Sequence, residues 1–160
     1  MNYLLKHWRS EMKKYQPSAI ELQEAHKPFL YELQMLRTAT DALADPSIQS
    51  NTALKNVIIE SALIHARNLY GFFSGKESSF DDIIAGHFVK NSDDTVWKSS
   101  KLTFISSRKE DINKALSHLT YTRIKFKPTW DIDRIRQDVE EAYVEFLALL
   151  PITENPKWQV

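Results

Sequence analysis

The sequence predicts an all-α protein, arranged as an up-and-down four-helix bundle with additional short helices. Glycine is scarce, at three of 160 residues, which disfavours a chain of strands joined by tight turns. Apolar residues instead recur every three or four positions over long stretches, the spacing of one face of an α-helix. Four such stretches with connections of moderate length are typical of an up-and-down bundle, and a less regular all-α fold is the alternative.

The first long helix is expected to end at Asp45-Pro46-Ser47. Pro28 either opens this helix or kinks a longer one that begins near Ser18, because proline fits a first helical turn but interrupts a helix interior. The predicted core stripe of this helix consists of Phe29, Leu33, Leu36, Thr40 and Leu43.

The second helix is expected from Asn51 to Phe73, with Gly71 and Gly75 at its end. Its charged residues are only Lys55, Glu60 and Arg67, so we expect it to be the central helix and to be buried on most faces. The predicted apolar side consists of Leu54, Ile58, Ala62, His65, Leu69 and Phe72.

The second half of the chain is expected to hold two further long helices. A short helix is predicted around Phe80–Ile84, with Ser79 as its cap, and a polar loop is predicted over residues 90–100, with Trp97 turned inward. The long helices are predicted over Ser106–Tyr121 and over Asp131–Leu150, where Pro151 ends the second. Residues 1–150 would then form one domain, and residues 151–160 a partly disordered tail.

Composition excludes several classes of function. The 21 basic and 21 acidic residues cancel, which argues against a general nucleic-acid binder, and the absence of cysteine excludes disulfides and thiolate metal sites. No segment has the roughly 18 apolar residues that a membrane span needs. The Glu-x-x-His repeats of di-iron bundles are also missing. We therefore expect a cytoplasmic protein without a metal, a small-molecule cofactor or a membrane contact.

Charge is nevertheless uneven along the chain. Residues 101–127 are mostly basic where they are charged, and residues 131–145 are mostly acidic. The two segments either attract each other or are simply solvated faces of the bundle, or the basic segment forms a local phosphate-binding face.

Two polar signatures lie within apolar helical stretches, Glu60–Phe73 and Asp111–Arg123. Charged and imidazole groups are costly to bury unless they are paired, so their presence there needs an explanation. On the second helix, His65 falls within the apolar stripe, while Glu60 and Arg67 face elsewhere. The structural interpretation is a core histidine satisfied by a neighbour and ion pairs to other helices.

His118 lies on the flank of the third helix, beside Asp111, and Lys114 and Tyr121 are its neighbours four and three residues away. A partly hydrated histidine titrates near neutrality, so it can take a proton from a ribose hydroxyl or give one to a leaving oxygen. Arg67, Lys114 or Arg123 would hold the phosphate. The alternative is that His118 is a surface or packing residue.

The Arg67-Asn68 pair on one helix and the run Ile112–Arg123 on another resemble the HEPN superfamily, small all-α bundles of bacterial defence and toxin–antitoxin systems. The resemblance implies a homodimer with a metal-independent RNase centre where the two subunits meet. The family motif is an arginine followed, four to six residues later, by a histidine. Asn113 to His118 has the matching spacing, but Asn113 stands where the family has arginine.

The leading functional hypothesis is therefore a metal-independent endoribonuclease that acts on RNA. His118 would be its general acid or base, and Arg67 and Arg123 would stabilise the phosphate charge. The other residues of the two signatures would bind substrate, namely Asn113, Lys114, Asn68 and Tyr121, or support the site, namely Glu60, His65 and Asp111.

A second hypothesis is a non-catalytic module that dimerises or docks a protein partner, such as an antitoxin, through the flank of the third helix. A third hypothesis is a purely structural bundle in which both signatures are buried hydrogen-bond networks.

Overall fold

The computed structural model describes residues 17–75, 81–93, 95–117 and 128–159. Within these ranges every regular element is helical, and a lone antiparallel bridge joins Lys90 to Val96. The predicted all-α class is therefore confirmed. The elements are α2 (Ala19–Glu24), α3 (His26–Ala42), α4 (Pro46–Ser50), α5 (Thr52–Ser74), η1 (Ala85–His87), α6 (Thr103–Ser117), α7 (Ile132–Leu149) and η3 (Asn155–Trp158).

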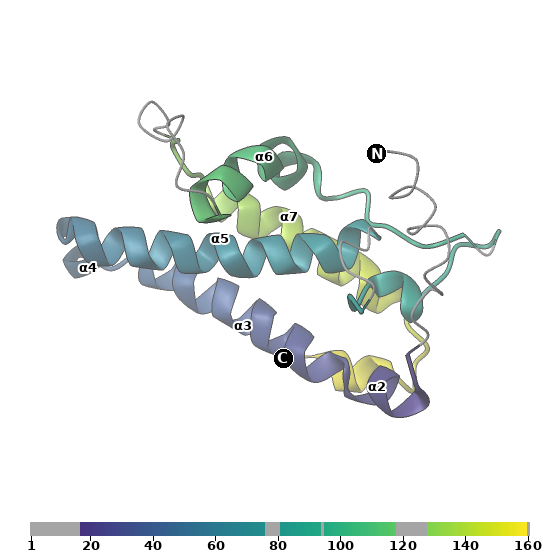
Figure 1. Ribbon diagram of the computed structural model, residues 1–160. Helices are drawn as coiled ribbons and strands as arrows, with labels where there is room; N and C mark the ends of the chain where they lie inside the picture. The colour runs from purple at the N-terminus through teal and green to yellow at the C-terminus, as the bar shows by residue number, and fades with distance from the viewer. Residues whose placement is uncertain (1–16, 76–80, 94, 118–127, 160) are drawn as a thin grey trace, which may run out of the picture.

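Helix α5 is the central helix, as predicted. It runs along the middle of the molecule with α6 on one side, α3 on the other and α7 behind it (Figure 1). An aromatic cluster fills the space between these helices, and its closest ring centroids are 4.7 Å apart, both between Phe29 and Phe72 and between Phe88 and Trp158. The cluster consists of Phe29, Phe72, Phe73, Phe88, Phe146 and Trp158.

The prediction that α5 is buried on most faces holds for three of its sides but not for the fourth. Helices α3, α6 and α7 cover three sides of it and leave the fourth exposed. Val57 is 63% exposed and Ile64 is 45% exposed on that side. The low charge of this helix suggested deep burial, but part of its apolar surface faces solvent instead.

The first helical stretch is interrupted, as the proline suggested. It begins with a capping box, in which the Ser18 side chain accepts from the Glu21 backbone N–H and Glu21 accepts from Ser18. The break lies at Ala25, so that Pro28 is the third residue of α3, where its missing N–H costs no helical bond. Asp45-Pro46 follows the end of α3 but also starts a further helix, α4, because Asp45 caps it.

The predicted helix around Phe80–Ile84 is wrong where the structure describes it. Ser79 and Phe80 lie outside the described residues, and residues 81–84 are not helical. Ile84 is extended and buried, and the helical turn comes directly after it, in η1. The predicted loop around residues 90–100 is confirmed for its described residues, 90–93 and 95–100, with Trp97 buried in the core.

Helices α6 and α7 lie where helices were predicted, but α6 begins at Thr103, three residues early. The Asp131 side chain caps α7 by accepting from the Arg134 backbone N–H at 3.0 Å. Pro151 follows its end. The last predicted residues of the third helix, 118–121, lie outside the described residues.

The expectation of a partly disordered tail is wrong for residues 155–158. They form η3, and Trp158 is only 2% exposed. The Tyr143 hydroxyl donates to the Trp158 carbonyl at 2.5 Å. Burial of the large indole ring ties this segment to the core, because aromatic side chains of this size remove much apolar surface from water.

Candidate functional site

Seven of the ten predicted site residues lie on two neighbouring helices, α5 and α6. The first of these carries Glu60, His65, Arg67 and Asn68, and the second carries Asp111, Asn113 and Lys114. The other three predicted residues, His118, Tyr121 and Arg123, lie outside the described residues.

His65 and Asn68 turn toward α3, where both contact the same carboxylate. His65 Nδ1 lies 2.7 Å from Glu32 Oε2, and Asn68 Nδ2 donates to that oxygen at 3.0 Å. The Tyr31 ring packs edge-on against His65, with ring centroids 5.8 Å apart. This is the arrangement of a largely buried histidine satisfied by a neighbour, and it links α3 to α5.

Glu60 and Arg67 lie on the uncovered side of α5, and both are exposed. Among the described residues neither has a hydrogen bond or an ion pair, and they do not contact each other. The expected ion pairs to other helices are therefore not present in the described part of the chain, and no contact is present through which Glu60 would orient Arg67.

Five exposed residues of α5 and the half-buried Gly71 repeat at intervals of four and three, on the side of the helix opposite its buried residues. At 100° per residue they occupy a sector of about 80° on the helix surface. We call this set the outer face of α5; it consists of Ala53, Val57, Glu60, Ile64, Arg67 and Gly71.

Gly71 is an unusual member of this face. Glycine within a helix is destabilising by roughly 0.5–1 kcal/mol relative to alanine. A Cβ atom at this position would meet nothing within 4 Å. Packing within the described chain therefore does not require a glycine here.

On α6, Asp111 has a structural partner. Arg108 Nη1 lies 3.0 Å from Asp111 Oδ2, and Arg108 Nη2 donates to the Thr129 carbonyl at 3.2 Å. The same guanidinium lies 5.2 Å from the centre of the Trp130 ring. Arg108 and Asp111 thus join α6 to the segment that leads into α7.

Asn113 and Lys114 make no such link. Lys114 is exposed, whereas Asn113 Oδ1 is buried and accepts no hydrogen bond from the described residues. A buried amide oxygen without a partner is uncommon, because it loses its bonds to water. Neither side chain contacts Arg67 by a hydrogen bond within the described residues.

The structure also contains a buried polar residue that we did not predict, Asp138 of α7. It is 1% exposed and accepts from the backbone N–H groups of Phe104 and Ile105 at 2.7 and 3.0 Å. It therefore caps the N-terminus of α6 from another helix. The sequence held a signal for it, because Asp138 falls on the apolar stripe of its helix, between Ile135 and Ala142.

A groove runs between α5 and the segment before α7. Its two adjoining hollows have volumes of about 430 and 520 Å³ and share Lys55, Ile59, Thr129 and Trp130. Glu60 lies at the edge of the first hollow, so the groove borders the outer face of α5. Of the other predicted site residues that the structure describes, none lines it.

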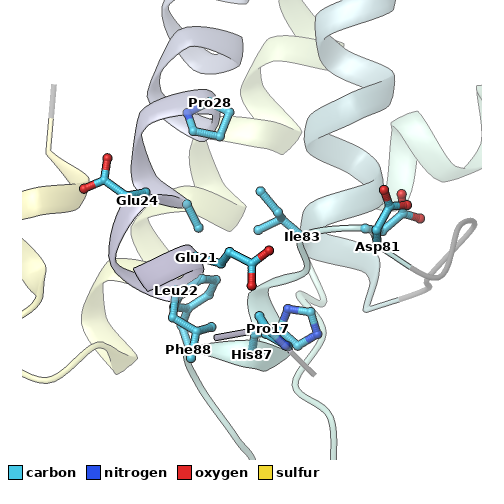
Figure 2. A pocket seen from close by; sticks show the side chains of 11 residues that line it. Pro17, Glu21, Leu22, Glu24, Pro28, Asp81, Ile83, His87 and Phe88 are labelled. Atoms are coloured by element: carbon cyan, nitrogen blue, oxygen red, sulfur yellow. The ribbon is translucent and has the colours of Figure 1, made fainter. Parts of the chain in front are cut away.

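A separate pocket of about 350 Å³ lies between α2 and η1 and is lined by Glu21, Glu24, Asp81 and Asp82 around apolar residues. Figure 2 shows the Glu24 and Asp81 carboxylates on opposite sides of this pocket. Across the described ranges no cluster of three or more histidine or acidic residues has the geometry of a metal site. Within the same ranges no helix is long and apolar enough to cross a membrane.

Comparison with known proteins adds no relative: no family model, no curated protein and no solved structure matches this chain.

Proposed function

We propose that this chain is a helical dimerisation module, built as a HEPN-like up-and-down four-helix bundle whose copies associate through the outer face of α5. The observation that supports this proposal is the composition of that face. It presents two exposed β-branched residues, Val57 and Ile64, together with two exposed charges that have no partner among the described residues.

Val57 and Ile64 place two large exposed apolar side chains on the outer face of α5, seven residues apart along the helix. Scattered single apolar residues are normal on a protein surface, whereas a contiguous group indicates an interaction site. Leu54 of α5 and Tyr31 of α3 are also exposed, but they lie on the flank of α5 that carries His65 and not on the outer face. The other large exposed apolar residues are dispersed over α2, α7 and the connecting segments.

The test is the mass of the full-length protein in solution, measured by sedimentation velocity over a range of concentrations. We expect a concentration-dependent dimer that Ile64→Glu converts to a monomer with an unchanged circular dichroism spectrum. Val144→Glu is the matched control, because Val144 is also exposed but lies on α7. A wild-type protein that remains monomeric at every concentration would exclude the proposal.

The second candidate is the metal-independent endoribonuclease of bacterial defence or toxin–antitoxin type. The specific observation in its favour is that Arg67 is exposed and forms no ion pair with an acidic side chain of the described residues. A phosphate can therefore reach it, and arginine binds phosphate in a bidentate manner. His118 would take the proton of a ribose hydroxyl or protonate the leaving oxygen, with Arg123 as a second cation.

This candidate predicts that RNA is cleaved in the presence of EDTA. His118→Ala should abolish cleavage, and Arg67→Ala should reduce it, while both proteins remain folded. Cleavage that survives unchanged in His118→Ala would rule out this mechanism.

A further inference from the structure

We propose that the partner of the outer face of α5 is the same face of a second copy, packed antiparallel about a two-fold axis at Ile64. Glu60 of each copy would pair with the partner's Arg67. This inference rests on the proposed dimerisation and specifies its geometry.

The first argument is the placement of the two charges along the helix. With a rise of 1.5 Å per residue, Glu60 lies about 6 Å before Ile64 and Arg67 about 4.5 Å after it. A two-fold axis at Ile64 reverses the direction of the second helix. It therefore brings Glu60 and the partner's Arg67 to within about 1.5 Å of each other along the helix axis. Both pairs form at once, because a two-fold interface uses the same patch on both copies.

The second argument is the glycine. Val57 and Gly71 lie seven residues before and seven residues after Ile64, so the same axis sets Val57 opposite the partner's Gly71. The absent side chain leaves open space on the outer face, since a Cβ at Gly71 would meet nothing within 4 Å. A valine side chain can occupy that space, and small residues allow two helices to approach closely. The dimer thus gives a reason for a glycine that the described monomer does not require.

The third argument is that other arrangements lose this match. In a parallel pair each residue faces its own copy, so Glu60 would lie against Glu60 and Arg67 against Arg67. Like charges placed opposite each other oppose association. The antiparallel arrangement pairs Glu60 with Arg67 and Val57 with Gly71, with Ile64 packed on Ile64 at the centre.

The experiment is a charge exchange in the full-length chain, read by sedimentation velocity. Glu60→Arg and Arg67→Glu, each alone, place like charges opposite each other at both pairs. We expect each to raise the dimer dissociation constant by about tenfold or more. The double variant E60R/R67E restores both pairs in reverse, so it should dimerise like the wild type. An equimolar mixture of the two single variants should form a heterodimer, because one copy then carries only arginine and the other only glutamate at these positions.

The outcomes separate the geometry from the dimerisation itself. If the single variants dimerise as well as the wild type, or if the double variant fails to recover, the antiparallel pairing is overturned and dimerisation through another arrangement remains. If the wild type itself is a monomer, the proposed dimerisation fails, and the geometry fails with it. Lys55→Glu, at a charged position of α5 outside this face, is the control and should leave the dissociation constant unchanged.

Discussion

Charged side chains between α3 and α7 are paired with one another, whereas those on the outer face of α5 are not. Arg37 donates from Nε and Nη2 to the two carboxylate oxygens of Glu140, at 2.6 and 2.7 Å. This hydrogen-bonded contact raises the pKa of the Arg37 guanidinium above its usual value. Arg136 Nη1 donates to Asp41 at 2.5 Å across the same junction. Glu60 and Arg67 have no such contact with any described residue.

The α3–α7 junction and the outer face of α5 differ in which residues lie opposite their charged side chains. At the α3–α7 junction, a second helix of the same chain supplies the opposite charge. On the outer face of α5 the opposite charge is present in the sequence but lies on the same helix, two turns away, and the two side chains do not contact each other. Two charges that are complementary but separated in this way can be satisfied by a second copy in reverse orientation.

The largest effect is expected from Asp138→Ala, which removes a charged side chain that is hydrogen-bonded within the chain. The substitution leaves two buried N–H groups at the start of α6 without an acceptor. We expect the free energy of unfolding to fall by about 2–4 kcal/mol, as when one partner of a buried polar contact is removed. Urea denaturation followed by circular dichroism measures this loss. Glu141→Ala, on the exposed side of α7, is the control and should change stability by less than about 0.5 kcal/mol.

The direct comparison of the two regions is Arg37→Ala against Arg67→Ala. Arg37 makes a half-buried bidentate pair, so its loss should lower the free energy of unfolding by about 1–2 kcal/mol. Arg67→Ala should change monomer stability by less than about 0.5 kcal/mol, because no intrachain pair is lost. Both are measured by urea denaturation at a concentration low enough to keep the protein monomeric. An equal loss for the two variants would mean that Arg67 has a structural partner within the chain.

The smallest expected effect is a gain. Gly71→Ala should raise the stability of the monomer by about 0.5–1 kcal/mol, because alanine favours the helix and its Cβ meets no other atom. The thermal unfolding midpoint of the dilute protein measures it. A lower midpoint would show that the backbone at this position needs glycine within the monomer itself, which would weaken the argument from the empty space.

Local patterns in the sequence predicted the long helices well. Helix α7 was expected at Asp131–Leu150 and lies at Ile132–Leu149, and α5 was expected at Asn51–Phe73 and lies at Thr52–Ser74. Apolar periodicity and cap residues are properties of neighbouring positions, so they can be read without knowing the fold. The short helix α4 also had such a signal, an aspartate cap followed by proline, which we interpreted only as the end of the preceding helix.

Contacts between distant segments were not predictable in this way. Helix α6 starts at Thr103 because Asp138, on another helix, accepts the hydrogen bonds of its first turn. Trp158 is ordered because the aromatic cluster of the core receives its ring. In both cases the partner lies far along the chain or on another element, and no local pattern indicates which one it is.

The same distinction between local sequence patterns and contacts of distant segments applies to the candidate site. The sequence by itself determined that Glu60, Ile64 and Arg67 share one side of their helix and that Val57 and Gly71 flank them at equal distances, because helical geometry fixes these positions. Only the tertiary structure decided that this side is the one left uncovered, and that His65 and Asn68 turn instead to Glu32. Which face of a helix is buried depends on where its neighbours pack, and that packing is a property of the whole fold.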